Sequence, residues 1–157
     1  CNVAPGLLRP KMGFERWASF SKQEASVMAE MRAQAKAAVR EASAPIMAMD
    51  IDPQAVELTL ANAKLAGVKL AHAVQPLDKL ALGTGPGLIA MNPPYGRRLA
   101  ADSSLYNDIA RLIARRRHWT VAVLAGDRSI ERALPKATRW QGVFNGDLDS
   151  RVLMFES

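Results

Sequence analysis

The residues best suited to chemistry form one short loop, Asn92-Pro93-Pro94-Tyr95, which follows the apolar run at 88–91. Two consecutive prolines fix φ and have no N–H to occupy a nearby carbonyl, so loop carbonyls can face a ligand. The Asn92 side-chain oxygen and a neighbouring main-chain oxygen then offer two acceptors suited to one NH₂ group, while Tyr95 offers a face to a planar base. The loop therefore predicts a site for an exocyclic amine, the alternative being a structural Pro-Pro turn.

Two acceptors would change how such an amine reacts. Its lone pair is delocalised into the ring, so the nitrogen attacks an electrophile poorly. Accepting both protons lets the nitrogen become tetrahedral as it attacks, which stabilises the transition state rather than the ground state. The predicted catalytic residues are Asn92, Pro93, Pro94 and Tyr95. No metal or strong base is required.

A second candidate, Asp50, stands where the apolar run at 46–49 ends. Ligands of a doubly wound sheet bind beyond the carboxyl ends of its strands, where a carboxylate can accept hydrogen bonds from both hydroxyls of a ribose. The alternative is an acid that favours the start of the next helix, a role that Asp52 fills equally well. Both interpretations stay open.

The elements that must position these residues alternate between helix and strand. Helical spacing and end signals predict helices over 21–42, 54–66, 104–116 and 129–134, with Ser21 as an N-cap and Gly67 closing the second. Apolar runs predict strands at 46–49, 68–74, 88–91, 120–125, 139–144 and 151–155. The alternation implies an α/β fold with a largely parallel sheet, and the turn at Asn145-Gly146-Asp147 implies an antiparallel hairpin.

Composition narrows the class of protein. The 157 residues are 49% hydrophobic and carry 21 Lys+Arg against 15 Asp+Glu, a formal charge of +6. No apolar run approaches the roughly 18 residues of a membrane helix and no secretory signal is evident, so we expect a cytoplasmic protein with no membrane partner. The single cysteine, Cys1, excludes an internal disulfide, and with two histidines we expect no metal site. The basic charge favours a polyanion such as nucleic acid and ordinary solubility about equally.

The loop resembles the (Asn/Asp/Ser)-Pro-Pro-(Tyr/Phe/Trp) motif of class I S-adenosylmethionine-dependent amino-methyltransferases, and its continuation Gly96-Arg97-Arg98-Leu99 narrows the match. The segments APGLLR at 4–9 and GFERW at 13–17 are similar to the stretch after the first cofactor motif of the THUMP-containing 23S rRNA guanine-N2 methyltransferases. Asp50-Ile51-Asp52-Pro53 resembles the second motif of that family, and 144–146 with 151–153 resembles its terminal hairpin. The resemblance covers nearly the whole chain.

This resemblance implies a Rossmann-like class I methyltransferase fold with S-adenosylmethionine as the cofactor. Asp50 would bind the cofactor's ribose, Ile51 would pack on its adenine, and Asn92 would lie beside it. The acid that reads the adenine amine in the family is replaced by Pro76, and Asp78 is the substitute we expect.

The implied substrate is a guanine of 23S ribosomal RNA, methylated at its exocyclic N2 amine. Asn92 and the Pro93 carbonyl would hold that amine, and Tyr95 would stack on the flipped base. Arg97 and Arg98, beside the loop, are the candidates for RNA phosphates.

One departure concerns the first motif of the family, a glycine-rich Asp-Pro-x-Cys-Gly-Ser-Gly loop, which we expect upstream of Cys1. Its strand is normally central, so the strands at 46–49 and 88–91 would lack the partner between them. Residues 1–157 would then be the C-terminal portion of a methyltransferase domain. We expect this portion to bind the cofactor poorly without the first motif.

Two other functions remain as alternatives. The tetrapeptide also occurs in adenine-N6 methyltransferases acting on DNA or RNA, whose substrate presents a similar NH₂ group. A non-catalytic nucleic-acid-binding remnant is consistent with the absent glycine loop. The basic run at 115–118 has two interpretations: it contacts RNA phosphates, or it complements the helix dipole and faces solvent, which is the interpretation that we favour.

Overall fold

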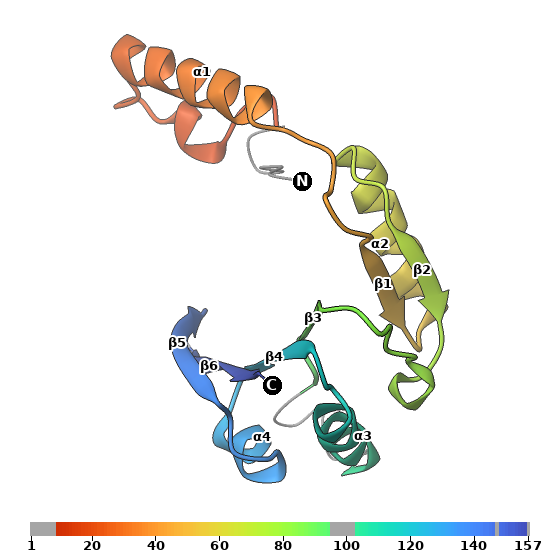
Figure 1. The fold of residues 1–157 in the computed structure, drawn as a ribbon. Helices are drawn as coiled ribbons and strands as arrows, with labels where there is room; N and C mark the ends of the chain where they lie inside the picture. The colour runs from red at the N-terminus through yellow and green to blue at the C-terminus, as the bar shows by residue number, and fades with distance from the viewer. Residues whose placement is uncertain (1–8, 95–102, 147, 157) are drawn as a thin grey trace. The chain divides into compact units, whose positions relative to one another are not determined.

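The computed structural model describes residues 9–94, 103–146 and 148–156, which divide into two compact units, Cys1–Gln75 and Pro76–Ser157 (Figure 1). The first unit contains η2 (Gly13–Arg16), α1 (Lys22–Ala37), β1 (Met47–Asp50), α2 (Pro53–Leu65) and β2 (Ala71–Val74). The second contains η3 (Leu77–Lys79), β3 (Gly87–Met91), α3 (Ser103–Ala114), β4 (Trp119–Ala125), α4 (Arg128–Ala133), β5 (Arg139–Asn145) and β6 (Leu148–Phe155). Every predicted helix and strand is present.

Helix α1 begins at the predicted cap. The Glu24 backbone N–H donates to the Ser21 hydroxyl at 3.2 Å, and the Ser21 N–H donates to the Glu24 carboxylate at 2.6 Å, which completes a capping box. These hydrogen bonds lower the pKa of Glu24. The predicted end near residue 42 is wrong, because the last turn tightens at Ala37 with a bond from Val39 N to Lys36 O.

The same helix is tied to η2 by an ion pair. Both terminal nitrogens of Arg32 donate to the Glu15 carboxylate, one of them at 3.2 Å, in the two-pronged geometry typical of strong Arg–carboxylate pairs. The Arg32 guanidinium holds the pKa of Glu15 below its usual value. Glu15 of the GFERW segment therefore has a structural role in joining η2 to α1.

The first unit is a βαβ crossover. Strand β1 pairs with β2 in parallel, from Met47 opposite Ala71 to Asp50 opposite Val74, and α2 connects them. Gly67 follows the helix with φ +67°, a left-handed conformation that suits glycine, as predicted. Among the described residues β1 has no other strand partner.

The second unit has the strand order β3-β4-β6-β5. Strands β3 and β4 are parallel, whereas β6 runs antiparallel to both β4 and β5, which confirms the predicted hairpin. Arg151 fixes this hairpin to α4, because its Nη1 donates to the Glu131 carboxylate at 3.1 Å while its guanidinium lies 4.0 Å from the centre of the Trp140 ring. Within the described ranges, β3 pairs only with β4.

The core lies almost entirely in the second unit. Helices α3 and α4 cover one face of the sheet, and the fully buried side chains include Ile109, Ile113, Val121, Ile130 and Phe155. In the first unit, Val56 is the one hydrophobic side chain that the described part of the chain buries. No helix in the described ranges is long and apolar enough to cross a membrane.

The edge of the sheet where β3 and β4 begin depends on a glycine. Gly87 lies directly opposite Trp119 in the parallel register, and the indole ring occupies the space of a side chain at 87. A Cβ atom there would lie 2.4 Å from a Trp119 ring carbon, well inside contact distance.

Gly87→Ala should therefore lower the free energy of unfolding by about 1–3 kcal/mol, the usual effect of overpacking. The measurement is urea unfolding followed by circular dichroism. Gly85→Ala is the matched control, because a Cβ at 85 meets nothing within 4 Å. Equal stability of the two variants would show that the ring does not require a glycine.

Candidate active site

Asp50 ends β1 with one carboxylate oxygen occupied and the other open. Its Oδ1 accepts the Asp52 N–H at 2.9 Å, while the Asp52 carboxylate accepts the Gln54 N–H at 2.9 Å and caps α2. The structure therefore assigns the helix cap to Asp52. No described residue donates to the Oδ2 of Asp50, and its side chain is exposed.

Ile51, next to Asp50, has 69% of its surface exposed although it is large and apolar. A β-branched hydrocarbon beside an open carboxylate oxygen fits a nucleoside, in which a ribose diol accompanies a planar apolar ring. Asp50 and Ile51 thus fit the cofactor roles that the resemblance implies.

The Asn-Pro-Pro segment follows β3 directly. Asn92 is exposed, Pro93 is buried and Pro94 is exposed, so the side chain of Asn92 faces outward from an anchored turn. No described residue donates to the carbonyl of Pro93 or occupies the Asn92 amide. Tyr95, Arg97 and Arg98 lie outside the described residues.

A tyrosine that sequence reasoning missed braces this loop. The Tyr106 hydroxyl, on α3, donates to the Pro94 carbonyl at 2.9 Å. Burial raises the pKa of Tyr106, and the Asp127 carboxylate raises it further, so the hydroxyl keeps the proton that it donates. Of the two proline carbonyls, Pro94's is therefore engaged inside the protein, and Pro93's is the one open to a ligand. The available signal was helical spacing, since Tyr106 shares the buried face of Ile109 and Ile113.

Asp78, the substitute acid, lies in η3 after Pro76. Its carboxylate is 3.3 Å from the Lys79 ammonium, and because both side chains are exposed this pair contributes little stability. Asp78 and Asn92 belong to the second unit, whereas Asp50 and Ile51 belong to the first. Within the described ranges, no three His, Cys, Asp or Glu side chains gather as a metal site would require.

These features define a class of protein. A parallel strand ending in an acid, a parallel strand ending in Asn-Pro-Pro and an antiparallel terminal hairpin compose a Rossmann-like methyltransferase fold. The solved structure of SMU.472 complexed with SAH superposes on 99% of this chain with a TM-score of 0.74 and 28% identity, and the match covers 42% of the length of SMU.472.

The family follows from the sequence comparison. The model of the RMKL-like methyltransferase domain matches residues 1–152, so the chain belongs to that family. Ribosomal RNA large subunit methyltransferase K/L of Shewanella loihica is 35% identical over 95% of the chain, and the protein of the same name from Allochromatium vinosum is 32% identical over 99%. The chain spans 22% of the length of each. These findings confirm the predicted methyltransferase family and α/β fold.

Tyr106→Phe should reduce the free energy of unfolding by about 1 kcal/mol at neutral pH, because it removes one hydrogen bond to a loop carbonyl. Since the folded-state pKa of Tyr106 is raised, its contribution is present below about pH 10, the ordinary tyrosine value, and is lost as pH rises through the folded pKa. Wild type and variant should therefore converge in strong alkali. Urea unfolding at neutral and alkaline pH measures this difference in stability. If the variant is as stable as the wild type at neutral pH, the hydrogen bond from Tyr106 to Pro94 does not stabilise the loop.

Proposed function

We propose that this protein transfers a methyl group from S-adenosylmethionine to the exocyclic N2 amine of a guanine in 23S rRNA. The observation that carries the proposal is the exposed Asn92 on a turn anchored by buried Pro93 and braced by Tyr106. The relatives named as large subunit rRNA methyltransferases support the RNA substrate. The choice of guanine N2 rests on the sequence resemblance. Such a protein would work in the cytoplasm, where ribosomal RNA is made.

The cofactor proposal rests on the sequence resemblance and on exposed side chains. The open oxygen of Asp50 would accept hydrogen bonds from the ribose, exposed Ile51 would pack on the adenine, and Asp78 would accept from the adenine amine. Asn92 would lie beside the reacting methyl group. SMU.472 was solved with SAH, the form of S-adenosylmethionine that remains after methyl transfer, which supports this cofactor.

When bound, S-adenosylmethionine supplies an electrophilic methyl group on a positively charged sulfur. The amine nitrogen would form the new bond to the methyl carbon as the carbon–sulfur bond breaks, with its electron pair remaining on sulfur. The Asn92 side-chain oxygen and the Pro93 carbonyl would accept the two amine protons, so that the nitrogen lone pair leaves conjugation with the ring. One proton then passes from the methylated nitrogen to water. Positioning supplies most of the remaining rate.

The RNA contacts would come from the residues beside the loop. Tyr95 would stack on the flipped guanine, and Arg97 and Arg98 would bind flanking phosphates. The extrusion of a base costs a few kcal/mol in a duplex and less in a loop, which favours an unpaired or weakly paired target.

We propose that residues 1–157 form the C-terminal portion of the methyltransferase domain. The observation that supports this is a pair of open strand edges, since β1 pairs only with β2 and β3 only with β4 in the described part of the chain. Backbone N–H and C=O groups along an unpaired strand edge lack hydrogen-bond partners, so the proposal includes a further strand with the glycine-rich loop at its end.

An adenine-N6 methyltransferase is the alternative within the same chemistry, because adenine presents an NH₂ group that the same two acceptors would hold. Methylation of RNA from tritiated S-adenosylmethionine, followed by nucleoside analysis, separates the products. N2-methylguanosine supports the proposal, and N6-methyladenosine would replace it.

Asn92→Ala should reduce the turnover of the full-length gene product by about 10² or more while leaving the fold intact, because it removes one transition-state acceptor. The measurement is single-turnover methyl transfer to ribosomal RNA. The matched control is Asn62→Ala, which removes an exposed amide from α2. Turnover equal to wild type in Asn92→Ala would remove Asn92 from the mechanism.

In the full-length gene product, Asp50→Ala should weaken S-adenosylmethionine binding by about 10- to 100-fold, the usual effect of losing hydrogen bonds to a charged group. Asp52→Ala provides the matched control, because it should cost about 1 kcal/mol of stability through the lost N-cap and leave affinity unchanged. Calorimetric titration measures affinity and thermal unfolding measures stability. The reverse pattern would assign the ribose to Asp52.

A further inference from the structure

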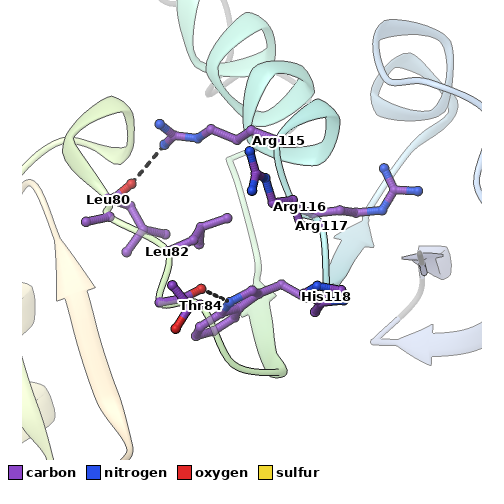
Figure 2. A pocket seen from close by; sticks show the side chains of 10 residues that line it. Leu80, Leu82, Thr84, Arg115, Arg116, Arg117 and His118 are labelled. Carbon is purple, nitrogen blue, oxygen red and sulfur yellow. Dashed lines mark hydrogen bonds between the residues drawn. The ribbon is translucent and has the colours of Figure 1, made fainter.

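A cavity of about 560 Å³ lies in the second unit between the loop at 80–84 and the turn at 115–119 (Figure 2). The turn joins α3 to β4, and the loop precedes β3, so the cavity lies where these two parallel strands begin. Asn92 follows the opposite end of β3. The five residues of β3, at about 3.3 Å each, separate the two ends of this strand by about 16 Å.

The cavity is strongly basic. Three consecutive arginines and His118 line it, and no acidic side chain does. The neighbouring acids are already paired: Asp78 with Lys79 at 3.3 Å, and the Glu156 carboxylate with Arg139 at 3.0 Å.

One of the three arginines, Arg116, has a structural role at the C-terminal end of α3. Arg116 donates to the Ile113 carbonyl and to the Glu156 carbonyl, both at 2.7 Å, so it caps the helix and ties it to the end of β6. A helix C-terminus carries about half a negative charge, which one cation satisfies. Arg115 and Arg117 are in excess of what the helix requires.

The positive charges of Arg115 and Arg117 have no acidic partner among the described residues. Arg115 is held in place by a 2.9 Å hydrogen bond to the Leu80 carbonyl, a neutral acceptor that leaves its charge intact. Arg117 is exposed, makes no hydrogen bond or ion pair with the described residues, and has φ +48°, a left-handed conformation in which glycine is the usual residue. Its side chain therefore adds no hydrogen bond or ion pair to the described part of the fold.

The geometry fits an extended anion better than a small one. Arg115 reaches toward Leu80, whereas Arg117 extends in the opposite direction, so the two guanidinium groups diverge (Figure 2). In this arrangement they do not converge on a single phosphate. The Trp119 ring is held in place, because its N–H donates to the Gly83 carbonyl at 3.0 Å and the ring packs on Gly87.

We propose that the rim of this cavity, Arg115 and Arg117 with His118, binds successive phosphates of the RNA strand that carries the target base. The inference deepens the proposed function by giving the RNA a second point of contact. Because β3 separates the cavity from Asn92, the bound phosphates would belong to nucleotides at some distance along the strand from the base held at Asn92.

The test is the salt dependence of RNA binding by the full-length gene product. The probe is fluorescein-labelled oligouridylate, which carries phosphates but no guanine, and the measurement is fluorescence anisotropy between about 50 and 200 mM KCl. Arg117→Gln should reduce the slope of log K against log salt by about 0.7, the value for one phosphate of a single strand. Arg117→Lys should keep the wild-type slope. Thermal unfolding should be unchanged in both variants, because the Arg117 side chain is exposed and makes no hydrogen bond or ion pair with the described residues.

The matched control is Arg132→Gln, which removes another exposed arginine from the same unit. A slope that falls equally in both glutamine variants would mean that only overall charge matters, and it would overturn the proposal. A slope unchanged in Arg117→Gln, with weakened binding of inorganic phosphate, would assign the cavity to a small anion and overturn it as well.

The two proposals fail separately. Methyl transfer to ribosomal RNA by Arg117→Gln should show a raised KM for RNA and an unchanged kcat. Absence of methyl transfer in the wild type would remove the proposed function, whereas the oligouridylate slope would still decide whether the rim binds RNA phosphates.

Discussion

The candidate site depends on how a short loop is held at the end of β3. Parallel pairing with β4 places Met91 opposite Val123 and so fixes where the strand stops. Beyond that point no ladder supports the backbone, and the loop is held instead by buried Pro93 and by the Tyr106 hydroxyl on the Pro94 carbonyl. Two prolines limit the loop to few conformations, and the tyrosine selects one of them. The outward direction of Asn92 is therefore a consequence of the α3–β4 core.

That core is unevenly distributed along the chain. The second unit buries a continuous apolar cluster from both helices and the sheet, with Ile109, Val121 and Ile130 fully enclosed. In the first unit, large apolar side chains such as Met47, Leu58 and Leu65 are mostly exposed, and the βαβ crossover relies on its strand ladder and caps. A crossover with so little burial is marginally stable alone. The acid at the end of β1 is thus positioned by local hydrogen bonds, whereas the Asn-Pro-Pro turn is positioned by packing.

The sequence predicted what depends on neighbours in the chain. The capping box at Ser21, the turn at Gly67 and the hairpin each follow from residues a few positions apart, and the structure confirms all three. Contacts between distant residues could not be predicted in the same way. Tyr106 is twelve residues from Pro94, and Trp119 meets Gly87 only because the two strands share a register. Which acid caps α2 could be predicted only in part. Asp50 and Asp52 lie in the same turn, so the sequence allows either to be the N-cap, and the backbone geometry selects Asp52.

The separation of the basic cavity from Asn92 has an electrostatic consequence for the proposed reaction. The attacking amine becomes positive as it takes the methyl group, so a fixed cation beside it raises the barrier. At about 4 Å two unit charges interact by about 4 kcal/mol at an effective dielectric of 20, whereas at about 16 Å the value is about 1 kcal/mol before salt screening. Screening at a Debye length of about 8 Å reduces the second value further. Arginines at the start of β3 can therefore attract RNA with almost no penalty at the amine, while Asn92 and the Pro93 carbonyl offer it neutral acceptors. The length of one strand thus separates this second contact with the polyanion from the amine, whereas the charges of Arg97 and Arg98, beside the loop, would be compensated by the phosphates that they bind.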